Sequence, residues 1–186
     1  MKSIVTCMLI ILLTATTLVL QAQIYTAPQG KIHFHSSTPL EDIDAVSSEA
    51  NCVLDATGRK ITAKVEMKSF AFPKPLMQQH FNESYVESDK FPYAILEATI
   101  VEKISFTKSG TYNITLKGTF EVHGIKRERT IKSKLIVHNG QPEKATAEFD
   151  VKLADHDIKV PTILVMKVAE IIKVDVSFTF NKVAKP

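Results

Sequence analysis

Tryptophan is absent from the 186-residue sequence, and both cysteine and arginine are scarce. Two cysteines cannot supply the framework of a small domain held together by disulfides. Three arginines occur, and the formal net charge at pH 7 is only +3. Because nucleic-acid-binding surfaces are strongly basic and often contact phosphates through arginine, this composition argues against a nucleic-acid partner.

Sequence motifs for catalysis and metal binding are also missing. The chain contains no GxSxG, CxxC or HExxH sequence, no glycine-rich phosphate loop and no EF-hand spacing. We therefore expect no metal, no cofactor and no catalytic activity. Because catalytic groups also assemble from positions far apart in a sequence, an enzyme remains an alternative.

Residues 1–22 have the pattern of a signal peptide. Lys2 supplies a positive start, an uncharged apolar run extends from Ile4 to Leu20, and Ala22 offers a small residue for cleavage. An uncleaved membrane anchor is the alternative, but the run is short and rich in threonine. We therefore expect export of one domain, residues 23–186, without a membrane span.

A cysteine and a few histidines are the remaining candidates for chemistry. Cys52 is the only cysteine after residue 22, so its expected role is that of a small buried hydrophobic residue. His33 and His35 would leave one strand on the same face, as a metal pair requires. That face is the polar one, so a solvated pair is expected. His80 and Asp155-His156-Asp157 leave an acid–base role open.

Alternation of apolar and polar residues recurs eight times along the chain. It is clearest between Gly110 and Gly140, where His123-Gly124 interrupts it at a turn. A two-residue period is typical of an antiparallel sheet that buries one face. The expected strands are Lys31–Ser37, Glu49–Ala56, Lys60–Phe72, Tyr93–Phe106, Thr111–Val122, Lys126–His138, Lys144–Leu153 and Glu170–Phe180.

One segment has helical character. Residues 75–86 begin with Pro75 and place apolar residues at near-helical spacing, without glycine. Residues 154–168 contain Pro161 and predict an irregular connection. The expected fold class is all-β: an eight-stranded antiparallel β-barrel with one short helical insertion at about residues 75–86, favoured over a sandwich. The glycines expected at turns with positive φ are Gly58, Gly110, Gly124 and Gly140.

The inward faces of these strands mix large and small side chains. Alanines and Gly118 interleave there with phenylalanine, isoleucine, leucine and valine. This mixture fits either a tightly filled interior or an apolar cavity that suits a hydrocarbon chain. The residues expected to line a cavity are Leu96, Ile100, Phe106, Tyr112, Ile114, Leu116, Phe120, Phe149, Val174 and Phe178.

Several segments resemble one known family. The sequence from Leu76 to Ala94, with Phe91-Pro92-Tyr93 near its end, resembles the helix and following aromatic-proline element of the YceI-like polyisoprenoid-binding proteins. The hairpin from Gly110 to Ile131 and residues 147–161 resemble two later elements in the same order. Phe34-His35-Ser36 also fits the family, and this short sequence resembles those of the branch found in Bacteroidetes.

The resemblance implies an extended lipocalin-like barrel in the bacterial periplasm that holds a long isoprenoid lipid and performs no catalysis. If that lipid has an anionic head group, Arg127 and Arg129 are candidates to contact it; simple solvation of both is the alternative. The leading hypothesis is therefore a non-enzymatic periplasmic, or secreted, protein with an apolar lipid as its partner. The alternatives are a filled barrel with a structural or protein-interaction role, and an enzyme that modifies a lipid or quinone through His80 or His156.

Overall fold

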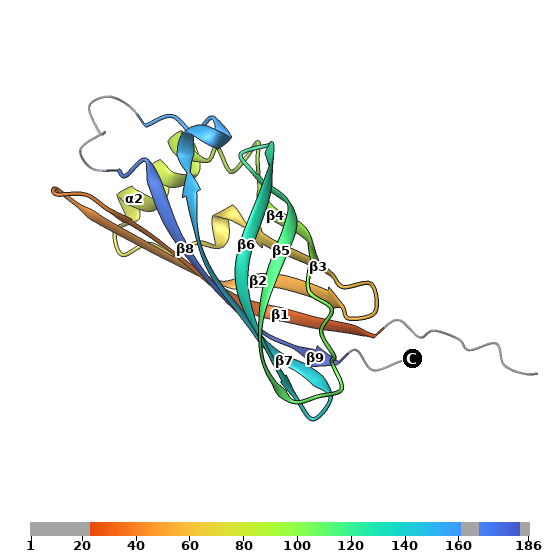
Figure 1. The fold of residues 1–186 in the computed structure, drawn as a ribbon. Helices are drawn as coiled ribbons and strands as arrows, with labels where there is room; N and C mark the ends of the chain where they lie inside the picture. Colours follow the sequence, from red (N-terminus) through yellow and green to blue (C-terminus); the bar gives the residue numbers. More distant parts are fainter. Residues whose placement is uncertain (1–22, 161–167, 183–186) are drawn as a thin grey trace, which may run out of the picture.

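A computed structural model describes residues 23–160 and 168–182, which form a long barrel capped at one end by short helices (Figure 1). The predicted signal peptide and residues 161–167 of the predicted irregular connection lie outside the described residues. The strands are β1 (Ile24–Ser37), β2 (Asp42–Asp55), β3 (Lys60–Glu66), β4 (Tyr93–Ile100), β5 (Gly110–Val122), β6 (Ile125–His138), β7 (Gln141–Lys152), β8 (Ile171–Thr179) and β9 (Asn181–Lys182). The helical elements are η1 (Met67–Ser69), α2 (Pro75–His80), the π-helix η2 (Phe81–Tyr85) and η3 (Leu153–His156).

The barrel closes because β1 pairs with strands on both of its sides. Strands β2 to β8 each pair antiparallel with the next strand along the chain, and β1 pairs antiparallel with both β8 and β2. This arrangement confirms the predicted eight-stranded antiparallel barrel and its helical insertion. The short β9, which was not predicted, pairs with the beginning of β1, so the two ends of the described chain lie side by side.

Two strands end earlier than predicted, and after each of them the main chain forms hydrogen bonds outside the predicted ladder. The third was expected to reach Phe72, but β3 ends at Glu66. Beyond it, the amide of Met67 donates to the carbonyl of Pro92 at 2.8 Å, and Ala71 pairs with β2. The fourth was expected to reach Phe106, but β4 ends at Ile100 and a loop follows. Strands β1 and β2 begin earlier than predicted and form one long hairpin.

Two of the four predicted glycine turns are confirmed. His123-Gly124 (φ 53° and 70°) and Asn139-Gly140 (φ 48° and 75°) place two consecutive residues at positive φ, which matches the twist of a tight hairpin. The prediction was wrong for Gly58 and Gly110, neither of which adopts a positive φ. In the turn after β2, the carboxylate of Asp55 instead accepts hydrogen bonds from the main chain.

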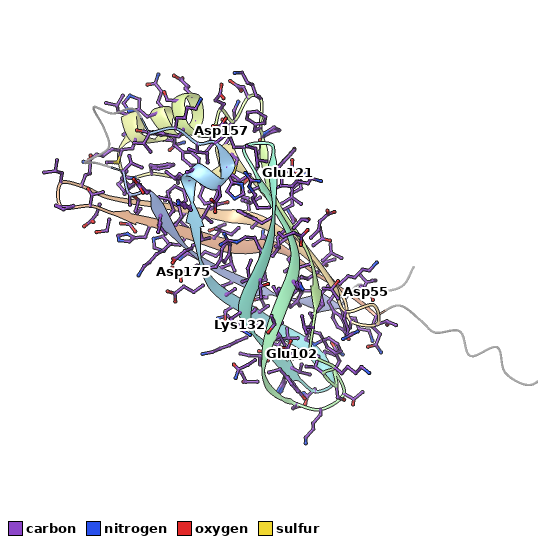
Figure 2. All side chains as sticks on the ribbon, turned by 45° about the horizontal axis from the view of Figure 1, so that its top comes forward. Asp55, Glu102, Glu121, Lys132, Asp157 and Asp175 are labelled. Atoms are coloured by element: carbon purple, nitrogen blue, oxygen red, sulfur yellow. The ribbon has the colours of Figure 1, made fainter. Side chains whose placement is uncertain are left out.

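The interior is tightly packed at the end of the barrel opposite the helices. Large apolar side chains with no more than 2% exposure fill this end: Leu54, Ile100, Ile114, Leu135 and Val137. Lys132, Asp157 and Asp175, labelled in Figure 2, are examples of exposed charged residues. None of the helices in the described part of the chain has the length and apolar character of a membrane span.

Candidate functional site: an apolar cavity beneath the helices

A cavity of about 460 Å³ lies at the end of the barrel that carries the helices. Residues of all eight barrel strands line it, at alternate positions on β8, where Val174, Val176 and Phe178 contribute. Large side chains meet small ones across neighbouring strands: Leu96 pairs with Ala63, and Phe178 pairs with Ala145. The small partners leave this part of the interior unfilled.

Residues 67–86, called the cap below, cover one side of the cavity with aromatic rings. Phe34 of β1 contacts Phe70 and Phe81 of the cap, with ring centroids 5.3 and 5.4 Å apart. Phe72 contacts Phe81 at 4.9 Å. The π-helical turn places Phe81 and Tyr85 in the cavity lining, and such turns are frequent at functional sites. The cap thus forms one aromatic wall of the cavity, and this wall packs against Phe34 of β1, which is distant from the cap in sequence.

The two serine hydroxyls in the lining make hydrogen bonds within the protein. Ser36 is 1% exposed, and its Oγ accepts a bond from the amide of Ala169 at 2.9 Å. The Oγ of Ser133 donates to the carbonyl of Thr146 at 2.8 Å. At the cap, burial raises the pKa of the Tyr85 phenol, which therefore stays protonated at neutral pH. Around these two serines the wall offers a ligand mainly apolar contacts.

Two charged residues of the lining form an ion pair between the cap and the loop that precedes β2. The Nζ of Lys74 lies 2.8 Å from Oε1 of Glu41, joining the start of α2 to the loop between β1 and β2. His80 of α2 also lines the cavity. In the described residues, His80 makes no ion pair. These groups give the cavity a polar margin beside its apolar wall.

The two arginines proposed as head-group contacts lie elsewhere. The β6–β7 ladder starts only at Ser133 and Ala147, so the earlier part of β6 lacks a strand partner on this side. Across this β6–β7 seam, Arg127 Nε donates to the carbonyl of Asp155 at 2.7 Å, and Arg129 Nη2 donates to that of Asp150. Neither arginine belongs to the cavity lining. Both act as links between the strands.

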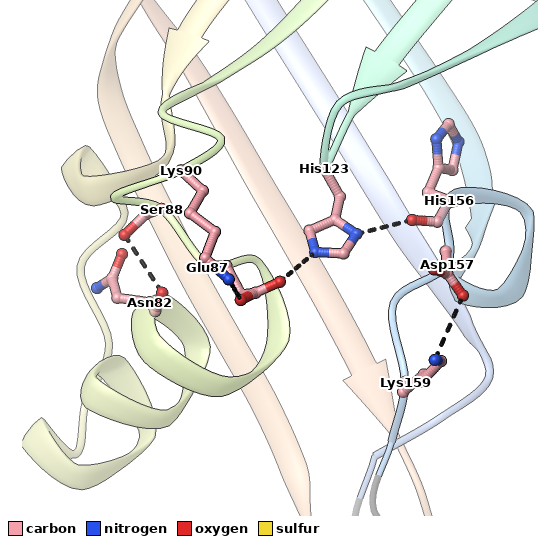
Figure 3. Close-up of polar contacts among 8 residues, drawn as sticks. All are labelled: Asn82, Glu87, Ser88, Lys90, His123, His156, Asp157 and Lys159. Atoms are coloured by element: carbon pink, nitrogen blue, oxygen red, sulfur yellow. Dashed lines mark hydrogen bonds and ion pairs between the residues drawn. The ribbon is translucent and has the colours of Figure 1, made fainter.

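A group of polar contacts closes the end of the same seam (Figure 3). His123 Nδ1 donates to the carbonyl of His156, and His123 Nε2 lies 3.2 Å from the carboxylate of Glu87. His156 is fully buried and donates from Nδ1 to the carbonyl of Ile125 at 3.0 Å. Burial lowers the pKa of His156, so the neutral ring is favoured. These contacts join the residue that follows the cap, Glu87, to the β5–β6 turn and η3.

The ten residues predicted to line a cavity divide into two groups. Ile100 and Ile114 belong to the packed end, Phe106 is buried outside the lining, and the hydroxyl of Tyr112 donates to the carbonyl of Lys108. Alternation shows which face points inward but not how deep along the barrel a residue lies. The predicted residues found in the lining are Leu96, Leu116, Phe120, Phe149, Val174 and Phe178.

The cap was the part of the site that sequence reasoning missed. Its phenylalanines were not named as cavity residues, although the near-helical spacing of Met77, Phe81 and Tyr85 signalled an apolar helical face. His33 and His35, expected to be solvated, are about one-third exposed and both contact Asp44, at 2.8 and 3.0 Å. Hydrogen bonds from His33 first, and then from His35, lower the pKa of Asp44. The described residues contain no group of three or more side chains suited to a metal ion.

The sequence matches the YceI-like domain over residues 26–180. The fold is similar to a polyisoprenoid-binding domain from Saccharophagus degradans implicated in plant cell wall breakdown, with a TM-score of 0.68 and 10% identity over 88% of this chain and 100% of that one. It is also similar to BcnA of Burkholderia cenocepacia, with a TM-score of 0.60 and 12% identity over 80% and 94% of the two chains. For the YCEI protein of Campylobacter jejuni, the TM-score is 0.52 and the identity 12%, over 92% of each chain.

These likenesses to solved structures show the fold alone. No curated protein sequence matches the chain. The prediction of a Bacteroidetes branch stays a prediction, whereas the family expected from the sequence is confirmed. Because the matched domain extends over nearly all of the described chain, this protein belongs to the YceI-like family.

Proposed function

We propose that this protein is a non-enzymatic lipid-binding protein that holds an isoprenoid chain, or a similar apolar chain, in the barrel cavity. The observation that carries the proposal is the character of the wall. Its lining is mostly apolar, and the hydroxyls of Ser36 and Ser133 are already bonded within the protein. Polar groups along a ligand would find few partners on this wall, and burying them without a partner would cost free energy. A hydrocarbon chain carries no such cost.

Burial of hydrocarbon provides enough free energy for binding. Each buried CH₂ contributes about 0.8 kcal/mol before the costs of ordering are subtracted. A few isoprene units therefore suffice for tight binding without any charged contact. The description of a similar solved structure as a polyisoprenoid-binding domain supports an isoprenoid as the ligand.

Export to the periplasm, or secretion, is part of the proposal. Residues 1–22 carry the sequence pattern of a signal peptide, and an apolar chain that crosses an aqueous compartment requires shielding from water. The placement of His80 and His156 supports a non-enzymatic role. His80 lines the cavity but makes no ion pair with the described carboxylates, and His156 lies outside the lining.

Lipid analysis of the purified protein tests the proposal. Residues 23–186, produced with export to a bacterial periplasm, should release an isoprenoid or a related lipid on solvent extraction, as detected by mass spectrometry. The delipidated protein should then take up farnesol. Ala63→Phe places a ring in the lining and should reduce this uptake, whereas Thr62→Phe places the same ring on the outer face of β3 and should not.

Two results would contradict the proposal. One is a lipid-free protein that also takes up no prenyl probe. The other is farnesol uptake that falls equally in both folded variants, since binding would then lie outside the cavity. Circular dichroism melts of both variants verify that each is folded.

A further inference from the structure

Phe178 lies at the inner limit of the cavity. It belongs to the lining and is only 4% exposed. On the neighbouring strand β1 stands Gly30, where an added Cβ would overlap Cε1 and Cδ1 of the Phe178 ring. The φ angle of Gly30 is outside the left-handed region, so glycine is required here for space. Because Gly30 has no side chain, the Phe178 ring can lie against β1.

The lining also ends on strands farther around the barrel, beyond β7, which pairs with β8. On β5 and β6 its last members are Leu116 and Ser133. The next inward residues, Ile114 and Leu135, are at most 2% exposed and are not part of the lining. Phe178 carries the largest of these last lining side chains. A chain that enters beneath the cap therefore meets the Phe178 ring and, beyond it, the packed end of the barrel.

The cavity volume limits how much hydrocarbon fits above this ring. An apolar cavity of about 150 Å³ holds one benzene molecule, and the cavity here has about three times that volume, about 460 Å³. It thus accommodates about three benzene-sized groups, or roughly 15–20 carbons of a chain. This corresponds to three or four isoprene units.

We propose that Phe178, seated on Gly30, is a length stop that sets the preferred ligand at three to four isoprene units. The inference rests on the proposed lipid-binding function and adds the chain length. Longer prenyl chains fit only if the remainder stays outside the barrel, so affinity should rise with chain length and then level off. The Phe178 side chain determines where it levels off.

Competition binding across a series of prenyl alcohols tests the length stop. Displacement of a fluorescent probe, N-phenylnaphthylamine, by geraniol, farnesol, geranylgeraniol and solanesol gives the length dependence for each variant. The affinity of the wild-type protein should stop rising with chain length at farnesol or geranylgeraniol. Phe178→Ala should move that point to a longer chain and strengthen binding of the first longer alcohol by about tenfold. Ala147→Leu, which fills the lining near Ala145, should move it to a shorter one.

Phe149→Ala is the matched control, because Phe149 lines the side wall. This variant widens the cavity without lengthening it. Phe178→Leu repeats the test with a smaller change in case Phe178→Ala does not fold. An unchanged length preference in folded Phe178 variants, or an equal shift in Phe149→Ala, overturns the length stop while the proposed function stands. Failure of wild type to bind any member of the series overturns both.

Discussion

His123 donates a hydrogen bond from Nδ1 to the carbonyl of His156 at 2.9 Å, and His156 in turn donates from its own Nδ1 to the carbonyl of Ile125 at 3.0 Å. Two histidines therefore connect η3 to the β5–β6 turn, at the place where β6 and β7 are not paired (Figure 3). Side chains here replace a strand ladder. The stability of this end of the barrel should consequently depend on the protonation of those side chains.

Acidification should destabilise the protein through His156. Burial lowers its pKa in the folded state, so below the usual histidine pKa of about 6.5 the unfolded chain binds a proton that the folded protein binds less readily. Stability should fall as pH falls from about 7 toward 5. His156→Asn keeps a donor near the position of Nδ1 but does not titrate. Urea unfolding of this variant should show a smaller dependence on pH over the same window.

His138→Asn provides the comparison, since His138 is exposed on β6. This substitution should leave the pH dependence of unfolding unchanged. Glu87 acts outside the window: Lys90 first, and then His123, lower its pKa, so its contribution disappears only at more acidic pH. If the stability of His156→Asn depends on pH as strongly as that of the wild type, another group causes the pH dependence.

The arginines of the β6–β7 seam should protect the main chain there from exchange. Arg127 and Arg129 donate to carbonyls across a gap in the ladder, and their removal leaves only the histidine contacts at the end of the seam. The double variant Arg127→Ala/Arg129→Ala should exchange amide hydrogens faster in residues 125–132, as measured by hydrogen–deuterium exchange with mass spectrometry. Because both arginines are partly solvated, the loss of global stability should be small, about 1 kcal/mol.

Lys134→Ala is the control for this prediction. Lys134 is an exposed residue of β6 within the part that pairs with β7. Its removal should leave exchange in residues 125–132 at the wild-type rate. Equal protection in the double variant would mean that the seam is held by the histidine contacts alone.

The strand pattern predicted the barrel, but not the depth of each residue within it. Ile114 and Leu116 are two apart on β5 and both face inward, as alternation requires. Leu116 lines the cavity, whereas Ile114 is buried in the packed end. Depth depends on which residues of neighbouring strands lie alongside, and so on strand register, which a single sequence does not specify.

The cap illustrates the same limit for contacts between distant segments. Its helix was predictable from Pro75 and the apolar spacing that follows, and the structure confirms a helical segment there. The contact of Phe70 and Phe81 with Phe34 was not predictable, because it depends on the chain turning away from the barrel after Glu66. The seam likewise arises from the register between β6 and β7, and it explains why Arg127 binds a carbonyl across the gap.

Cys52 should be unreactive in the folded protein. It is 1% exposed, and burial raises its pKa to about 12, so almost no thiolate exists at pH 8. In residues 23–186, Ellman's reagent should label no thiol natively and one thiol after denaturation. Thr111→Cys adds an exposed cysteine on β5 and should label at once. Rapid native labelling of wild type would indicate that the β2 region of the barrel opens frequently.

Gly118→Ala should destabilise the barrel strongly, because the space at Gly118 is bounded by main chain. An added Cβ would overlap the carbonyl oxygen of Glu97 and lie 2.6 Å from Cα of Ala98, both on the paired strand β4. Main-chain atoms cannot move aside by changing rotamer, so the β4–β5 ladder itself must shift. We expect a loss of about 3 kcal/mol in the free energy of unfolding.

Gly110→Ala separates this steric effect from the general effect of replacing glycine in β5. At Gly110 the nearest atom to an added Cβ is Cε2 of Tyr112 at 3.8 Å, an ordinary contact, and φ lies outside the left-handed region. This substitution should therefore change stability by less than about 1 kcal/mol, in either direction. Urea unfolding of the two variants under the same conditions gives the comparison. If the two variants are equally stable, β4 and β5 have room for a Cβ at Gly118, and the large–small alternation of this wall does not depend on the glycine.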